Sequence, residues 1–134
     1  LSLHAGTDQT RQRIVPMAKR HTLDALLAAC REYPLPGSRK LMLEYVILPG
    51  VNDSEAELSA VARWTGDLKC LVNLVPFNPF PGSNFRSPTP AEARAVLDRL
   101  RALGVPSTIR WPRGRSVDGA CGQLALRGTA AHPR

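Results

Sequence analysis

Residues 41–64, LMLEYVILPGVNDSEAELSAVARW, decide the fold of this 134-residue chain. The segment Leu41–Leu48 is rich in β-forming residues and ends at Pro49-Gly50, which predicts a strand followed by a turn. Ser54 and Glu57 then have the spacing of a capping box ahead of apolar residues at helical intervals. The stretch therefore predicts a strand, a tight turn and an amphipathic helix in succession.

The same alternation continues on both sides of this stretch. Thr22–Tyr33 has the apolar spacing of a helix capped by Thr22, and Thr89-Pro90-Ala91-Glu92 is a capping box that opens a helix ending near Gly104. Alternating strands and helices indicate an α/β fold, in which helical crossovers connect parallel strands. The remaining predicted strands are Leu1–His4, Leu71–Val75 and Ser107–Arg110.

Polar side chains follow three of the predicted strands, where sites of α/β sheets collect. Ser2 and His4 alternate around Leu3, which predicts that both point to one side of the sheet. Taken alone, His4 fits a hydrogen-bonded histidine at a sheet end better than a ligand site. Asn78, between two prolines, and Asn52-Asp53 fit turns first. Glu44 is either a functional acid or an outward-facing one, since its periodicity does not decide.

The composition excludes several classes of protein. With 14.6 kDa, 43% apolar and 22% charged residues, the chain resembles one ordinary globular domain. Its apolar runs are shorter than the ~20 residues of a membrane-spanning helix. The chain begins at Leu1 without Met or a leader, so we expect a piece of a longer protein. Motifs of kinases, zinc proteases and serine hydrolases are missing from the sequence.

Positive charge is concentrated at the two ends of the sequence. The formal net charge is +7, with +4 in residues 1–40, −3 in residues 41–98 and +6 in residues 99–134. This distribution favours a polyanionic partner such as nucleic acid, or reflects an Arg-rich genome. Near the C-terminus, basic side chains alternate with an aromatic one, which indicates either a phosphate-and-base contact patch or a solvated loop. These residues are Arg110, Trp111, Arg113 and Arg115.

The cysteines indicate a reducing, cytoplasmic setting. Cys30, Cys70 and Cys121 are odd in number and widely spaced, unlike a disulfide framework, and no pair has the spacing of a metal or cluster motif. Cys30 lies on the apolar side of a predicted helix and Cys70 precedes a strand, so both are expected in the core. Cys121, with Gly119 and Gly122 on either side of it, is either a nucleophile or incidental.

Six motifs, taken in order, resemble the radical S-adenosylmethionine (SAM) RNA methyltransferases of the RlmN/Cfr type. The resemblance extends to about Gly128 and implies the C-terminal half of a partial (β/α) barrel. It assigns residues 1–128 to the C-terminal part of the core domain and residues 129–134 to a disordered tail. The motifs are Ser2-Leu3-His4-Ala5, Arg13-Ile14-Val15-Pro16, Glu44-Tyr45-Val46, Gly50-Val51-Asn52-Asp53, residues 72–82 and Ala120-Cys121-Gly122-Gln123-Leu124.

The resemblance also implies cofactors and site residues. The cofactors are SAM and a 4Fe-4S cluster, and the cluster's CxxxCxxC ligands are expected upstream of Leu1, with no metal ligand in this chain. Ser2, Leu3, His4 and Asn78 match the SAM-binding positions of the family. Cys121 matches the cysteine that is itself methylated and passes the methyl group to RNA.

The implied reaction is methylation of carbon 2 of an adenosine in 23S ribosomal RNA and, in some members, of transfer RNA. The implied protein is a cytoplasmic monomer that needs an electron donor and no membrane. Two alternatives stay open: methylation of carbon 8, as in the Cfr type, and an RNA-binding remnant without catalysis. Because the cluster motif is missing from these residues, we expect the chain alone to be inactive.

Overall fold

The computed structural model describes residues 1–111 and shows a parallel sheet with helical crossovers. Its strands are β1 (Leu41–Ile47), β2 (Cys70–Pro76) and β3 (Ser107–Ile109), in the spatial order β1-β2-β3. Both strand pairs are parallel. The predicted first strand is reduced to a single parallel bridge between Ser2 and Glu44. The α/β class predicted from the sequence is confirmed.

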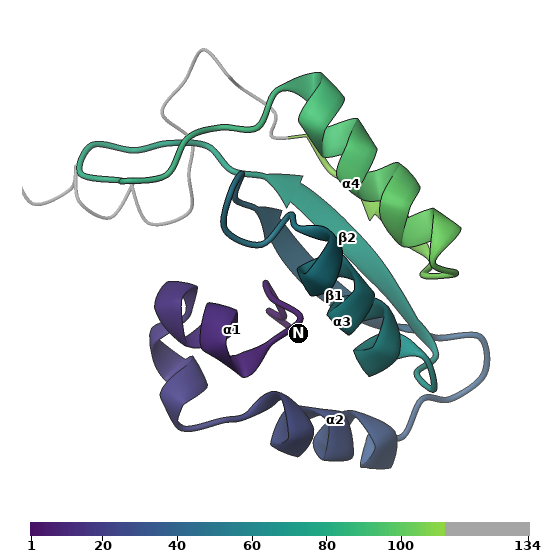
Figure 1. The fold of residues 1–134 in the computed structure, drawn as a ribbon. Helices are drawn as coiled ribbons and strands as arrows, with labels where there is room; N and C mark the ends of the chain where they lie inside the picture. Colours follow the sequence, from purple (N-terminus) through teal and green to yellow (C-terminus); the bar gives the residue numbers. More distant parts are fainter. Residues whose placement is uncertain (112–134) are drawn as a thin grey trace, which may run out of the picture.

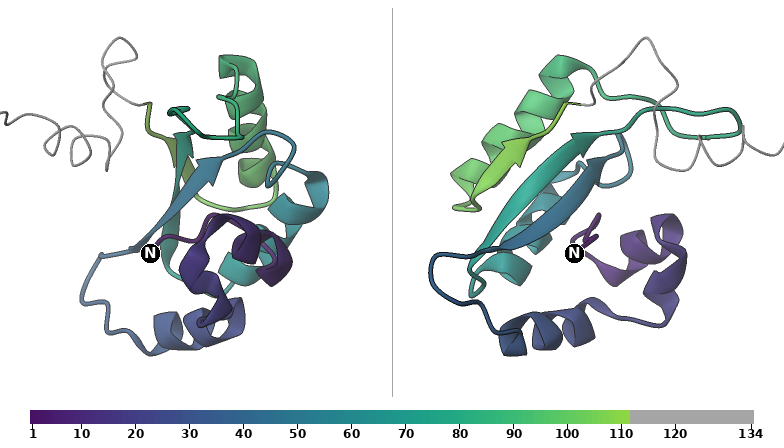
Figure 2. Two further views of the ribbon diagram at one scale, coloured as in Figure 1. Left: turned by 90° about the vertical axis from the view of Figure 1, so that its left-hand side faces the viewer. Right: turned by 180° about the vertical axis from the view of Figure 1, so that it is seen from behind.

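The helices lie on one side of this sheet. Seen from the side, α3 (Glu55–Thr65) and α4 (Pro90–Ala102) flank the same face of the strands, and α2 (Leu23–Glu32) lies below them (Figures 1 and 2). A further helix, α1 (Asp8–Ile14), and a 3-10 turn at Pro16–Lys19 were not predicted. The reason is that α1 lacks an apolar repeat and is held by polar contacts.

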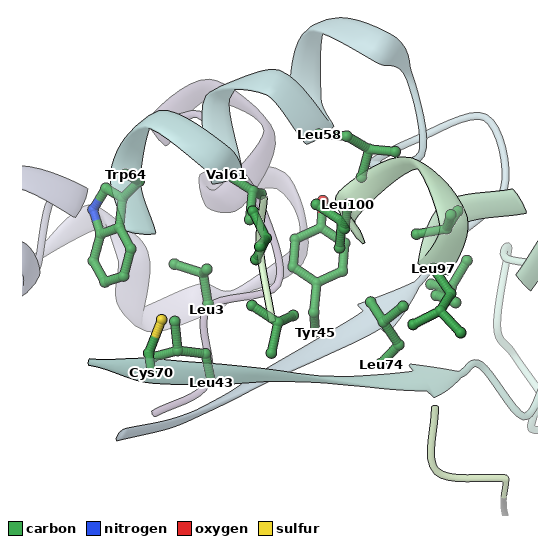
Figure 3. Close-up of a cluster of buried hydrophobic side chains, with 14 of the residues drawn as sticks. Leu3, Leu43, Tyr45, Leu58, Val61, Trp64, Cys70, Leu74, Leu97 and Leu100 are labelled. Carbon is green, nitrogen blue, oxygen red and sulfur yellow. The ribbon is translucent and has the colours of Figure 1, made fainter. Parts of the chain in front are cut away.

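The core fills the space between the sheet and these helices (Figure 3). Alternate side chains of β1 and β2 point toward α3 and α4, because successive strand residues face opposite sides. Cys70 is 2% exposed and Cys30 packs against the same core, so the structural role predicted for both is confirmed. The labelled core residues are Leu3, Leu43, Tyr45, Leu58, Val61, Trp64, Cys70, Leu74, Leu97 and Leu100.

The other face of the sheet is covered by no described helix. Seen from behind, the strands of residues 1–111 face the viewer directly (Figure 2, right). The burial patterns of β1 and β2 agree with this, with buried side chains toward the helices and less buried ones on this second face, apart from Asn73, which is buried on the second face. We call it the helix-free face; strand register assigns to it Met42, Glu44, Val46, Leu71, Asn73, Val75 and Thr108.

The two predicted capping boxes have different outcomes. At α4, Thr89 accepts the Glu92 backbone N–H and the Glu92 carboxylate accepts the Thr89 N–H, so this box is complete. At α3, the Ser54 hydroxyl accepts the Glu57 N–H, but the Glu57 carboxylate does not return to Ser54. The prediction of a full box at Ser54 was therefore wrong.

The Glu57 carboxylate instead anchors the segment before α1. It accepts hydrogen bonds from the Gly6 N–H at 2.8 Å and from the hydroxyls of Thr7 and Thr10 at 2.6 Å each. Glu57 is 7% exposed, and its position near the N-terminus of α1 is favourable for a negative charge. A buried carboxylate thus fixes residues 6–10 against α3.

No helix within residues 1–111 has the length and apolar character needed to cross a bilayer. The predicted domain boundary at residue 128 and the predicted tail at 129–134 lie outside the described residues.

Candidate functional site

Ser2 and Leu3 run beside β1 as an extended segment. The Leu3 N–H donates to the Glu44 carbonyl at 3.0 Å, and the Glu44 N–H donates to the Leu1 carbonyl at 2.8 Å. Leu3 is fully buried in the core, while Ser2 on the opposite side is exposed. Ser2 and Leu3 therefore point to opposite sides of this segment, as the predicted alternation requires for Ser2.

The backbone hydrogen bonds between this segment and β1 end at His4, and hydrogen bonds from side chains take their place. His4 has a φ of 60°, and its Nδ1 accepts the Val46 N–H at 3.1 Å. The Val46 carbonyl is in turn satisfied by Nδ2 of Asn52 at 2.7 Å. An imidazole nitrogen that accepts an N–H carries no proton, so the proton of neutral His4 is on Nε2. No residue within 1–111 forms a hydrogen bond with Nε2.

The charge state of His4 follows from its surroundings. Burial lowers the pKa of His4 below 6.5, and the positive charge of Arg11 lowers it further, while Glu44 acts in the opposite direction. His4 is therefore neutral at pH 7 and offers one N–H donor from Nε2. The structure thus defines the tautomer and charge state of this residue, which its sequence position alone did not.

Asn52 holds the backbone of His4 in place. This side chain is fully buried; Nδ2 also donates to the His4 carbonyl at 2.9 Å, and Oδ1 accepts the Leu48 N–H at 2.9 Å. The Tyr45 hydroxyl donates to the Asn52 carbonyl at 2.7 Å, and burial raises the pKa of Tyr45 above its usual range. The turn predicted at Asn52 is correct, but its side chain also supports the site.

Arg11 holds the same segment from the other side. Its Nε donates to the Leu3 carbonyl at 3.0 Å, and Nη2 donates to the Ser2 carbonyl at 3.3 Å. Nη1 donates to the His21 carbonyl at 3.0 Å. Arg11 is 5% exposed, and burial lowers its pKa from the usual value. Arg11 was not predictable, because nothing in a single sequence marks an arginine that binds carbonyl groups.

Glu44 and Asn73 form a polar pair in the middle of the helix-free face. The two residues are direct partners in the β1–β2 register. Nδ2 of Asn73 donates to both carboxylate oxygens of Glu44, at 3.0 and 2.9 Å. Asn73 is 6% exposed and Glu44 half-buried. The sequence left the direction of Glu44 open; the structure places it on the helix-free face.

Asn78 lies at the end of the sheet where β1 and β2 both terminate. The pairing of Ile47 with Pro76 places the two strand ends together, and Asn78 follows two residues later. Within residues 1–111 no hydrogen bond joins Asn78 to Ser2 or His4. Ser2 pairs with Glu44 in the middle of β1, His4 lies one step nearer the strand end at Val46, and Asn78 follows the end of β2.

The basic and thiol positions are only partly covered by the structure. Arg110 is exposed directly after β3, and its backbone N–H donates to the Leu74 carbonyl at 2.8 Å. Arg113, Arg115 and Cys121 lie outside the described residues.

The protonation of His4 gives a testable prediction. We expect His4 to hold its proton on Nε2 and to titrate with a midpoint below pH 6.5. Because the folded pKa lies below the unfolded one, its contribution to stability is complete above pH 6.5 and is lost as the pH falls through the folded pKa. Two-dimensional NMR of ¹⁵N-histidine identifies the tautomer, and His4→Asn, which tolerates a positive φ, assigns the signal. A doubly protonated ring at pH 7 would contradict the prediction.

Comparison with known proteins gives consistent matches over nearly the whole chain. The chain is 45% identical over 125 residues to the dual-specificity RNA methyltransferase RlmN of Paramagnetospirillum magneticum, covering 92% of the chain and 27% of that protein. It is 47% identical over 124 residues to RlmN of Pelobacter propionicus, covering 92% and 36%. A probable RlmN of Thermus thermophilus is 42% identical over 127 residues, covering 95% and 36%. No family model matches the chain.

The solved structures agree with these matches. A radical SAM methyltransferase from Sphaerobacter thermophilus superposes with a TM-score of 0.83 and 42% identity, covering 91% of this chain and 36% of that one. A domain of a pyruvate-formate lyase-activating enzyme from Bacteroides vulgatus shares the fold alone, with a TM-score of 0.61 and 16% identity over 81% and 64% of the two chains. The chain thus spans between about a quarter and about a third of its RlmN relatives.

Proposed function

Because this chain is homologous to RlmN-type radical SAM methyltransferases over 92% of its length, we propose that it forms the C-terminal part of the core domain of a radical SAM RNA methyltransferase. In the proposed enzyme, further strands continue the sheet beyond Ser2, and the helix-free face becomes the interior of a partial barrel. The observation that carries the proposal is this identity combined with polar groups on a sheet face that no described helix covers.

The polar residues near this face suit SAM, which contains an ammonium group, ribose hydroxyls and an adenine ring. His4 supplies a neutral N–H donor from Nε2, and the exposed Ser2, two residues earlier, supplies a hydroxyl. Asn78, at the adjoining strand end, supplies an amide. We propose that Ser2, His4 and Asn78 hold SAM, and that Arg11 and Asn52 keep the Ser2–His4 backbone in position. Leu3, matched to a SAM-binding position by the resemblance, is fully buried in the core, and its carbonyl binds Arg11, so its part is to anchor the segment.

The described residues do not fit the second cofactor. Within residues 1–111 no group of three or more His, Cys, Asp or Glu side chains is placed to hold a metal ion. We therefore propose that the ligands of a 4Fe-4S cluster come from a part of the enzyme preceding Leu1. When bound, the cluster would supply the electron that cleaves SAM reductively.

Cys121 is proposed as the thiol that accepts a methyl group and carries it to RNA. Carbon 2 of adenine is electrophilic and cannot accept a methyl cation directly, so a radical route through a protein-bound carbon is needed. Arg110, Arg113 and Arg115 are proposed to contact RNA phosphates, since they belong to the most basic part of the sequence. We propose 23S ribosomal RNA and transfer RNA as substrates.

Mass spectrometry of digested RNA tests this function. We expect the complete enzyme that carries this chain, supplied with SAM and a reductant, to convert adenosine in 23S ribosomal RNA to 2-methyladenosine. The isolated 134-residue chain serves as a matched sample and should give no product. A product methylated at carbon 8 would show the Cfr-type reaction. Salt-sensitive RNA binding without any methylated product would favour a non-catalytic role instead.

A further inference from the structure

Glu44 is a charged side chain on the helix-free face that forms no ion pair within residues 1–111. The ion pairs of these residues are Arg31–Asp67, Arg86–Glu92 and Arg99–Glu55. The neighbours of Glu44 on the same face of β1 are Met42 and Val46, and those on β2 are Leu71 and Val75 around Asn73. A carboxylate in apolar surroundings is unfavourable unless hydrogen-bond donors compensate it.

Asn73 satisfies part of the hydrogen-bonding capacity of Glu44 and also directs the carboxylate. Both Glu44 oxygens accept hydrogen bonds from the same Nδ2, which leaves further lone pairs on each oxygen. The interaction fixes the Glu44 side chain in one orientation, because Asn73 is 6% exposed and lies directly opposite it in the register. The oxygen of a glutamine at position 44 could also accept from Asn73, so this cross-strand pair alone does not require a negative charge there.

Glu44 also lies beside the proposed SAM-binding segment. Ser2 forms its parallel bridge with Glu44, and the charge of Glu44 affects the pKa of His4. The Ser2–His4 segment and Glu44 therefore lie side by side in the sheet, with the exposed Ser2 in register with Glu44. A ligand there would meet a donor and a negatively charged acceptor of complementary character.

We propose that Glu44, oriented by Asn73, is a further binding residue for SAM and accepts hydrogen bonds from its ammonium or ribose hydroxyl groups. This inference rests on the proposed function, since it assumes that SAM binds on the helix-free face. Glu44 is the binding residue in this arrangement, and Asn73 is a positioning residue.

Isothermal titration of SAM into the complete, cluster-loaded enzyme tests the inference independently of turnover. Glu44→Gln keeps an oxygen for the Asn73 contact and removes the charge. We expect its SAM dissociation constant to rise about 10- to 100-fold, as for loss of a charge-assisted hydrogen bond, with an unchanged thermal midpoint. Glu44→Asp, which keeps the charge, should bind SAM more tightly than Glu44→Gln. If Glu44→Gln folds poorly, Glu44→Asp is compared with the wild type in its place.

Glu32→Gln is the matched control, because Glu32 is exposed at the end of α2. It should bind SAM as the wild type does. Equal SAM affinity of the wild type and both Glu44 variants would overturn the inference while leaving the proposed function intact. A wild-type enzyme that binds no SAM would overturn the proposed function, and the role of Glu44 with it.

Discussion

Replacing Cys121 with alanine should abolish methyl transfer to RNA in the complete enzyme. If Cys121 carries the methyl group, no other group in the route replaces its sulfur, and the yield of methylated adenosine should fall by at least about 10³-fold. SAM affinity should stay unchanged, because the proposed SAM contacts involve other residues. Mass spectrometry of digested RNA measures the product, and titration measures the affinity.

The matched control for this variant is Cys30→Ala. Cys30 packs against the core, and burial raises the pKa of its thiol, which makes it a poor nucleophile. This variant should keep its methylation activity. Full activity in Cys121→Ala would contradict the proposed methyl carrier.

Replacing Gly6 with alanine should destabilise the fold strongly. A Cβ at this position would lie 2.3 Å from the Glu57 carbonyl oxygen, 2.8 Å from Cβ of Ala60 and 2.8 Å from the Val61 nitrogen. These are mainly backbone atoms of α3, which cannot move aside without shifting the helix. We expect a loss of about 3 kcal/mol and a thermal midpoint lower by at least about 5 °C.

Gly66→Ala is the matched control for Gly6→Ala. Gly66 ends α3 in a helical conformation, and its nearest contacts to an added Cβ are 3.5 and 3.6 Å. Alanine fits there without strain, so the thermal midpoint should stay the same or rise slightly. Because Gly6 follows the Ser2–His4 segment closely, Gly6→Ala should also weaken SAM binding. Equal midpoints for the two variants would contradict the close approach of residue 6 to α3.

The strands and the larger helices were predictable because their signals are local. The β-rich run before Pro49-Gly50 and the caps at Thr22 and Thr89 need only neighbouring residues to be recognised, and the structure confirms them. The helix α1 was missed, because its support comes from Glu57, about fifty residues away. The same contact explains why the capping box at Ser54 is incomplete: its glutamate serves another helix.

The candidate site was predictable only at positions near the predicted strand ends. Ser2, His4 and Asn78 could be singled out by position and by resemblance. Arg11 and Asn52, which hold the His4 segment in place, could not be singled out, because they act on backbone carbonyls through long-range contacts. The pairing of Glu44 with Asn73 depends on the β1–β2 register, which a single sequence does not fix. The assignment of Cys121 remains a prediction.

The most direct test of the central claim is the crystal structure of the complete enzyme with SAM bound. We predict SAM against the helix-free face, with His4 donating from Nε2 and with Asn78 and Glu44 within hydrogen-bond distance. The same structure should show the preceding part of the enzyme pairing with the Ser2 side of the sheet. SAM bound elsewhere, or a helix-free face filled by protein side chains, would contradict the account.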